Sequence, residues 1–136
     1  MDFIRTMMIA ASGLRAQTDR MRVISENIAN ADSTAANSQS DPYRRRIPTF
    51  RSAFDKELQA NVVQLGKIQT DKSDFQVRNE PGNPAADAAG NVKYPNVNTL
   101  IETVDMREAQ RSYEANLNVI GATRRMISRT LDLLKA

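Results

Sequence analysis

Apolar residues recur every seven positions through the last third of the chain, residues 98–134. Two registers carry this repeat, and their apolar members are Met106, Tyr113, Ile120, Ile127 and Leu134 in one and Leu117 and Leu131 in the other. A seven-residue repeat is typical of α-helices that wind around each other with a left-handed twist. The segment contains no proline. We therefore predict one helix, roughly 55 Å long at 1.5 Å per residue, that packs against a partner.

The first 30 residues repeat the pattern and supply that partner. We predict that the two terminal helices pair as a coiled coil through a seam of large apolar residues, namely Met7, Leu14, Met21, Ile28, Met106, Tyr113, Leu117, Ile120, Ile127, Leu131 and Leu134. The alternative interpretation is a conventional helical bundle. A bundle of this length needs further apolar helices, however, and the middle of the chain does not offer them.

Local signals mark where these helices begin and end. Thr99 and Glu102 have the spacing of a capping box at the start of the second helix. The first helix is expected to end in the run 27–34, because asparagine tolerates the left-handed backbone of a helix terminus and Asp, Ser and Thr favour turns. The polar tract 35–40 has almost nothing to bury and is predicted to be a loop.

The middle of the chain has a mixed pattern. Residues 43–47 have extended character that Pro48 ends, and 51–60 place Phe54 and Leu58 at helical spacing, which predicts a short helix. The β-rich segments 62–69 and 75–78 are expected to form a hairpin through the turn 70–74. A long loop follows over 81–91, and 92–95 is extended. The predicted fold is mainly α: a coiled-coil domain of residues 1–34 and 96–136, with a small β-hairpin-containing insert at 35–95.

Composition narrows the possible functions. Among the 136 residues, cysteine and histidine are absent, which excludes thiol nucleophiles, disulfides and imidazole bases. The acids of the insert fit no calcium-loop spacing. We therefore predict that the protein is not an enzyme and uses no cofactor or metal. No stretch approaches the ~20 apolar residues of a membrane span, and the apolar run 7–13 lacks the basic flank of a signal peptide.

The net charge of +3 is spread evenly, since residues 1–31, 32–97 and 98–136 each carry one excess base. Nucleic-acid-binding proteins usually gather their charge on one face, so this balance is weak evidence for such a partner. The triplet Arg44, Arg45 and Arg46 is the most conspicuous cluster. It has three interpretations: a grip on phosphates, pairing with carboxylates of a neighbouring subunit, or a solvated face.

Several apolar residues lie off the predicted seam: Phe3, Ile24, Leu100, Val104, Val119 and Met126. Exposed on a monomer, they would favour aggregation. We therefore expect lateral contacts with other chains. Complementary patches on different faces of one protein build rings or helical filaments.

Several short blocks of the sequence are similar to those of a known family. The N-terminal blocks are Ser12-Gly13-Leu14, Gln17 and the run 27–31 (Asn-Ile-Ala-Asn-Ala) followed by Ser33-Thr34. The others are the run 42–45 (Pro-Tyr-Arg-Arg), 95–98 (Pro-Asn-Val-Asn), 104–116 with its Arg-Ser-Tyr-Glu-Ala-Asn block, and 130–134. Together they resemble the bacterial flagellar basal-body rod proteins, and the C-type proximal-rod subunits in particular. Asn83 and Asn91 depart from the pattern where histidine and an aromatic residue are expected.

The resemblance implies a structural subunit of a hollow, helically built rod that crosses the periplasm and transmits motor torque. It implies export by the flagellar type III apparatus without a cleavable signal peptide. It also implies partners among copies of itself and other rod proteins, and a position peripheral to the inner-membrane ring rather than across the membrane. The residues that we predict to contact other subunits are Arg44, Arg45, Arg46, Asn27, Asn30, Asn96 and Asn98. The alternative function is a helical nucleic-acid-binding protein or another coiled-coil adaptor.

Overall fold

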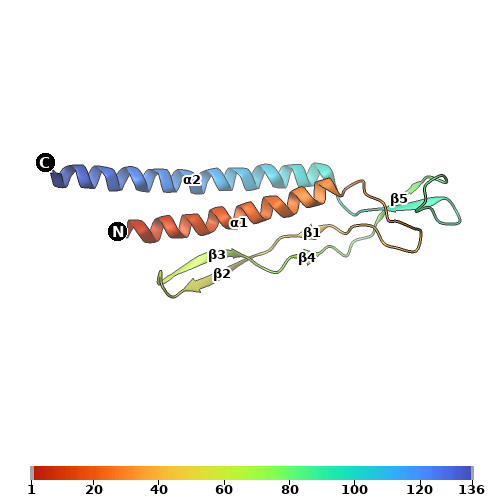
Figure 1. Ribbon diagram of the computed structural model, residues 1–136, viewed down its shortest axis with the longest axis horizontal. Coiled ribbons are helices and arrows are strands. Elements are labelled where there is room, and N and C mark those ends of the chain that lie inside the picture. Colours follow the sequence, from red (N-terminus) through yellow and green to blue (C-terminus); the bar gives the residue numbers. More distant parts are fainter. Residues whose placement is uncertain (1, 136) are drawn as a thin grey trace. The chain divides into compact units, whose positions relative to one another are not determined.

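The computed structural model describes residues 2–135 and contains two long helices joined by a β-containing insert (Figure 1). Helix α1 is Phe3–Ala29 and helix α2 is Thr99–Lys135. The strands are β1 Arg46–Ile47, β2 Phe50–Asp55, β3 Ala60–Leu65, β4 Gln69–Thr70, β5 Gln76–Asn79 and β6 Asn91–Tyr94. The predicted pair of terminal helices around a small β insert is confirmed, with helix bounds close to those that the heptad pattern gave.

The described residues form two compact units. We call residues 2–21, 49–67 and 107–135 the hairpin unit, and residues 22–48 and 68–106 the network unit. Each unit combines segments of both helices with part of the insert. The predicted division, with the helices in one domain and the insert in another, stays a prediction.

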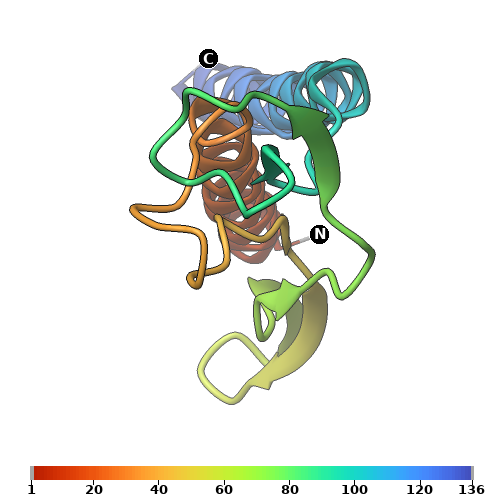
Figure 2. The ribbon, with the colours of Figure 1, turned by 90° about the vertical axis from the view of Figure 1, so that its right-hand side faces the viewer.

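In the hairpin unit, β2 and β3 form an antiparallel hairpin with Phe50 opposite Leu65 and Asp55 opposite Ala60. It is a twisted two-stranded ribbon (Figure 2). The Asp55 carboxylate accepts hydrogen bonds from the backbone N–H groups of Glu57 and Leu58 at the turn. The short helix predicted over 51–60 is therefore wrong. Aspartate favours such side-chain-bonded turns, and the ladder to β3 outweighs the helical spacing of a few apolar residues.

In the network unit, β1 pairs with β4 and β5 pairs with β6, both antiparallel. The hairpin predicted between 62–69 and 75–78 is therefore wrong, because each segment takes a partner from elsewhere in the insert. Val92 and Tyr94 of β6 form a small buried cluster with Ala85 of the preceding loop. The loop between β5 and β6 ends at Gly90, whose φ of 79° is rarely adopted by other residues.

The start of α2 also differs from the prediction. The side-chain oxygen of Asn98 accepts hydrogen bonds from the backbone N–H groups of Leu100 and Ile101 and caps the helix. The predicted capping box of Thr99 and Glu102 is therefore wrong. Asparagine is among the best N-cap residues, and the Glu102 side chain is engaged elsewhere.

Within the hairpin unit, the segments of α1 and α2 lie side by side and run in opposite directions (Figure 1). The side chain of Asn116 lies against Gly13 so closely that a Cβ there would come within 2.8 Å of its amide nitrogen. Arg20 and Glu108 pair at 3.6 Å farther along. The buried helix residues of this unit are all small: Ala10, Ala16, Ala109 and Thr123. The closest approach given between these segments thus involves a small and a polar residue, Gly13 and Asn116.

Candidate functional site

A buried carboxylate lies at the centre of the network unit. Glu102 is 1 % exposed, and its side chain accepts hydrogen bonds from Arg45 Nε and from Asn27 Nδ2, the latter at 3.0 Å. Arg45 also lies 3.7 Å from Asp71 and 3.6 Å from Asp105. Helix α2 and the segment before β1 are therefore joined by one guanidinium among three carboxylates.

The same contacts determine the ionisation of Arg45. Burial alone lowers the pKa of a guanidinium, because it disfavours the charged form. The hydrogen bond and the charge of Glu102, together with Asp71 and Asp105, outweigh burial and raise the pKa of Arg45 above its ordinary value. The arginine is thus held firmly in its charged state.

Asn27 extends this network into helix α1. It is 0 % exposed. Its side-chain oxygen accepts hydrogen bonds from the hydroxyl of Tyr43 and the backbone N–H of Arg46, and its amide nitrogen donates to the Arg46 carbonyl as well as to Glu102. One side chain therefore satisfies both backbone groups of a β1 residue, as a neighbouring strand would.

Asn96 forms a hydrogen bond to the backbone of Arg45, the residue before Arg46. It accepts a hydrogen bond from the N–H of Arg45 at 2.8 Å and donates to the carbonyls of Asp71 and Ser73. Hydrogen bonds from the backbone and side chain of Ser73 lower the pKa of Asp71 below its ordinary value, with a smaller contribution from Arg45. We call Asn27, Tyr43, Arg45, Asn96 and Glu102 the polar network.

The three consecutive arginines have separate intrachain partners. Arg44 lies over the ring of Phe75 at 4.1 Å and 4.0 Å from Asp41. Arg45 is in the polar network, and Arg46 pairs with Glu26 at 3.1 Å. Because each has a carboxylate nearby in its own chain, the structure does not favour the phosphate-gripping interpretation.

The remaining predicted contact residues have intrachain bonds too. Asn30 donates to the carbonyl of Glu26 at the end of α1, and Asn98 caps α2. With no exposed surface, Asn27 has an intrachain role in this structure. Contact of the seven predicted residues with other subunits stays a prediction.

The residues of the predicted helix-pairing seam all retain exposed surface. Met7, Leu14, Met21, Met106, Tyr113, Ile120 and Ile127 are half-buried, whereas Ile28, Leu117, Leu131 and Leu134 are exposed. Coiled-coil pairing through these residues therefore stays a prediction. A single copy of the chain covers this surface only in part.

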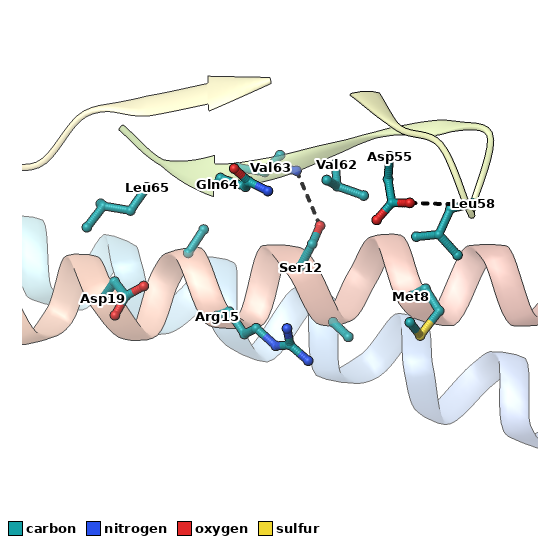
Figure 3. A pocket seen from close by; sticks show the side chains of 12 residues that line it. Met8, Ser12, Arg15, Asp19, Asp55, Leu58, Val62, Val63, Gln64 and Leu65 are labelled. Atoms are coloured by element: carbon teal, nitrogen blue, oxygen red, sulfur yellow. Dashed lines mark hydrogen bonds between the residues drawn. The ribbon is translucent and has the colours of Figure 1, made fainter. Parts of the chain in front are cut away.

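A groove of about 370 Å³ lies between α1 and the β2–β3 hairpin (Figure 3). Met8, Leu58, Val62 and Leu65 supply apolar walls, and Arg15, Asp19 and Asp55 supply charges. The hydroxyl of Ser12 accepts a hydrogen bond from the N–H of Val63 at 3.3 Å, which ties the hairpin to the helix. Among residues 2–135 no group of three acidic, histidine or cysteine side chains is arranged to hold a metal ion.

Comparison with known proteins identifies the family. Residues 7–35 match a family model described as flagella basal body rod protein, and residues 88–133 match one described as flagellar basal body rod FlgEFG protein C-terminal. The flagellar basal-body rod protein FlgC of Agrobacterium fabrum is 54 % identical over 128 residues, which cover 94 % of this chain and 92 % of the relative. The chain belongs to the FlgC family of flagellar basal-body rod proteins. The FlgC of Bacillus subtilis is 37 % identical over 99 % of this chain and its own full length, and that of Escherichia coli O157:H7 is 37 % identical over 92 % of each.

The family predicted from the short sequence blocks is thus confirmed. This rod protein is a structural subunit of the flagellar basal body, not an enzyme, and the nucleic-acid-binding alternative is not favoured. None of the helices in the described part of the chain is both long and apolar enough to cross a membrane.

Sequence reasoning missed the polar network, although one signal pointed to it. Asn27 comes one turn after Val23 and Ile24, both fully buried. A polar residue that continues an apolar face is expected to be buried with its hydrogen bonds satisfied.

Proposed function

We propose that this rod protein joins copies of itself and other rod proteins in the proximal rod, a hollow shaft in the periplasm that transmits torque and conducts exported subunits. In this proposal the flagellar type III apparatus exports it, and it lies peripheral to the inner-membrane ring. The heptad residues of α1 and α2 complete their coiled-coil packing only within the assembly. Membership of the rod family supports this role.

The observation that carries the proposal is the exposure of apolar helix residues in the hairpin unit. Leu117 is 51 % exposed, and Leu133 and Leu134 are each 79 % exposed. Contiguous exposed apolar surface marks sites of protein association. In this proposal, burying the apolar surface makes the rod stiff. Each packed side chain makes many contacts with its neighbours, and all of them must be broken together before it can move.

Complementation of a flagellated bacterium that lacks its own FlgC tests the role. The wild-type chain is expected to restore swimming and intact basal bodies. Leu117→Ala combined with Ile120→Ala is expected to be produced and exported but to yield few complete rods. Truncating a buried Leu or Ile costs about 2–5 kcal/mol, and in this proposal that cost arises only in the assembled rod, because both side chains are partly exposed in the single chain.

Lys72→Ala is the control, because Lys72 is an exposed residue of the loop between β4 and β5. It is expected to swim normally. If the wild-type chain accumulates in the bacterium but is absent from purified basal bodies, the proposal fails.

A further inference from the structure

Strand β2 has an edge that faces away from the rest of the hairpin unit. The sheet of this unit contains only β2 and β3 among the described residues, so each strand has one edge without a neighbouring strand. The N–H of Val63 in β3 donates to the hydroxyl of Ser12 in α1. The groove against α1 is lined by four residues of β3 but by only the last residue of β2 (Figure 3). The free edge of β3 therefore faces α1, and that of β2 faces away from it.

The register of the hairpin identifies the backbone groups on the outer edge of β2. The N–H of Gly66 donates to the carbonyl of Thr49 at 2.6 Å, and hydrogen-bonded pairs alternate with non-hydrogen-bonded pairs along an antiparallel ladder. Phe50, Ser52 and Phe54 therefore belong to non-hydrogen-bonded pairs, and their N–H and C=O groups point outward. All three residues are exposed. An exposed edge of this kind is a template for pairing with another strand.

The aromatic residues of β2 favour a second copy of the same strand as that partner. Phe50 and Phe54 are 42 % and 58 % exposed, and they lie on one face because alternate residues of a strand do. Each is two residues away from Ser52. If two β2 strands pair antiparallel with Ser52 opposite Ser52, Phe50 of each chain lies directly opposite Phe54 of the other. Cross-strand aromatic pairs stabilise antiparallel sheets.

The charges on the other face of β2 fit the same register. Arg51 of one strand then lies opposite Ala53 of the other and diagonal to Asp55, a distance that a long side chain can span. The two-fold axis places this opposite-charge pair twice. A slip by two residues in either direction would separate both aromatic pairs, so the side chains define a single register.

We propose that β2 of one chain pairs antiparallel with β2 of a second copy, about a two-fold axis at Ser52, as a dimer of the unassembled protein. The combined sheet has the strand order β3-β2-β2-β3, and each outer edge faces the α1 of its own chain. The dimer therefore closes and protects the edge from further pairing. A contact along one strand edge is smaller than the roughly 800 Å² per partner of a standard interface, so the dimer is expected to dissociate on dilution.

This contact joins the same surface of both chains, so it differs from the open-ended contacts that a helical rod needs. It does not rest on the proposed function, because it concerns the chain before it is incorporated.

A single cysteine at the axis tests the contact, since the chain has no cysteine of its own. Ser52→Cys places the two thiols on opposed residues with Cα atoms about 5.5 Å apart, within the span of a disulfide. Mild oxidation of the purified protein is expected to give a covalent dimer as the main product. The matched control is Lys56→Cys, which is also exposed. Lys56 lies beyond the end of β2, so its two copies are more than roughly 20 Å apart along the paired strands at 3.4 Å per residue, and no dimer is expected.

Proline at the axis provides the second measurement. Ser52→Pro removes an outward N–H but no bond to β3, and edge strands tolerate proline where the N–H faces solvent. Circular dichroism is expected to match wild type. One hydrogen bond from each copy is lost, so the dissociation constant from sedimentation equilibrium is expected to rise at least about tenfold. Ser52→Thr, the matched control, keeps the N–H and is expected to associate like wild type.

Three results would overturn the proposal. The first is a folded Ser52→Cys protein that gives no more covalent dimer than Lys56→Cys. The second is a Ser52→Pro protein that dimerises as strongly as wild type, because the contact would then lie elsewhere. The third is the Ser52→Cys dimer within purified basal bodies, which would place the contact in the rod rather than in the unassembled protein. Failure of the wild-type chain to enter basal bodies would count against the rod function alone and would leave these measurements unaffected.

Discussion

The network unit buries large apolar side chains such as Val23, Ile24, Val92 and Tyr94, whereas Val62 is the only large side chain that the described hairpin unit buries. Of the large apolar side chains that are exposed among residues 2–135, most belong to the hairpin unit. The network unit also satisfies its buried polar groups internally. The comparison indicates that the network unit holds its structure within a single chain, while the hairpin unit leaves its apolar surface exposed, as the proposed assembly requires.

Hydrogen exchange on the dilute monomer gives the sharpest test of this contrast. Local opening free energies range from near zero up to the global value, typically about 5 kcal/mol or more. We expect backbone amides of 22–29 and 102–106 to approach the upper limit, and those of 5–21 and 107–135 to exchange far faster. Within assembled rods, the backbone amides of both groups of residues should exchange slowly. Equal protection along both helices of a verified monomer would refute the contrast.

Removing the buried carboxylate should destabilise the network unit strongly. Glu102→Ala leaves Arg45 without its hydrogen-bonded partner and Asn27 Nδ2 without an acceptor. Breaking a buried ion pair costs about 3–5 kcal/mol. We expect a loss of stability near the lower end of this range, because Asp71 and Asp105 remain near the guanidinium of Arg45. Urea unfolding followed by circular dichroism measures the loss.

The matched control is Glu108→Ala in the hairpin unit. Glu108 also pairs with an arginine, but its side chain is 66 % exposed, and exposed ion pairs contribute about 0–1 kcal/mol. Similar losses in the two variants would show that burial of Glu102 has little effect on stability.

Asn27→Ala should have a smaller but clear effect. It removes the partner of both backbone groups of Arg46 and of the Tyr43 hydroxyl. A buried polar group left unsatisfied costs about 1–3 kcal/mol. Asn30→Ala removes one side-chain bond at the C-terminal end of α1 and serves as the control in the same urea experiment. The prediction fails if both variants unfold at the wild-type urea midpoint.

The sequence allowed the helices to be predicted better than the insert, for a physical reason. A heptad pattern over 37 residues of α2 repeats its signal many times, and it does not depend on distant residues. The strands β1 and β4 contain two residues each. Their pairing depends on Asn27 and Asn96, whose bonds to the backbone join segments far apart in the sequence, and no local pattern encodes such contacts.

The heptad residues show a different limit of prediction from the sequence. The period predicts a face for helix packing, but it does not tell whether that face closes within one chain or between chains. The close approach of Asn116 to Gly13 in the hairpin unit is another contact that the period does not predict. Glu102 was misassigned for a similar reason: its spacing from Thr99 fits a capping box, and only the fold reveals Arg45 as its partner.

The smallest expected effect concerns Tyr94 in the network unit. Its hydroxyl donates to the two carboxylate oxygens of Glu80 at 2.9 and 3.0 Å, and this hydrogen bond is the main reason that the pKa of Tyr94 is raised, with burial and the charge of Glu80 adding to it. A folded-state pKa above the unfolded value means that this bond stabilises the fold below about pH 10, the unfolded tyrosine pKa. The stabilisation is lost as the pH rises through the folded pKa.

Absorbance titration at alkaline pH measures that pKa in a variant where Tyr43 and Tyr113 are replaced by Phe, so that the signal comes from Tyr94 alone. Adding Glu80→Gln removes the negative charge beside the forming tyrosinate and is expected to lower the midpoint, while Asp87→Asn, a change at an exposed acid of the neighbouring loop, should leave it unchanged. Because the network unit holds its structure within one chain, the midpoint should also be the same in the monomer and in isolated rods. A midpoint that moved only on assembly would show that this cluster, too, is completed by a neighbouring chain, and the distinction between the two units would then be one of degree.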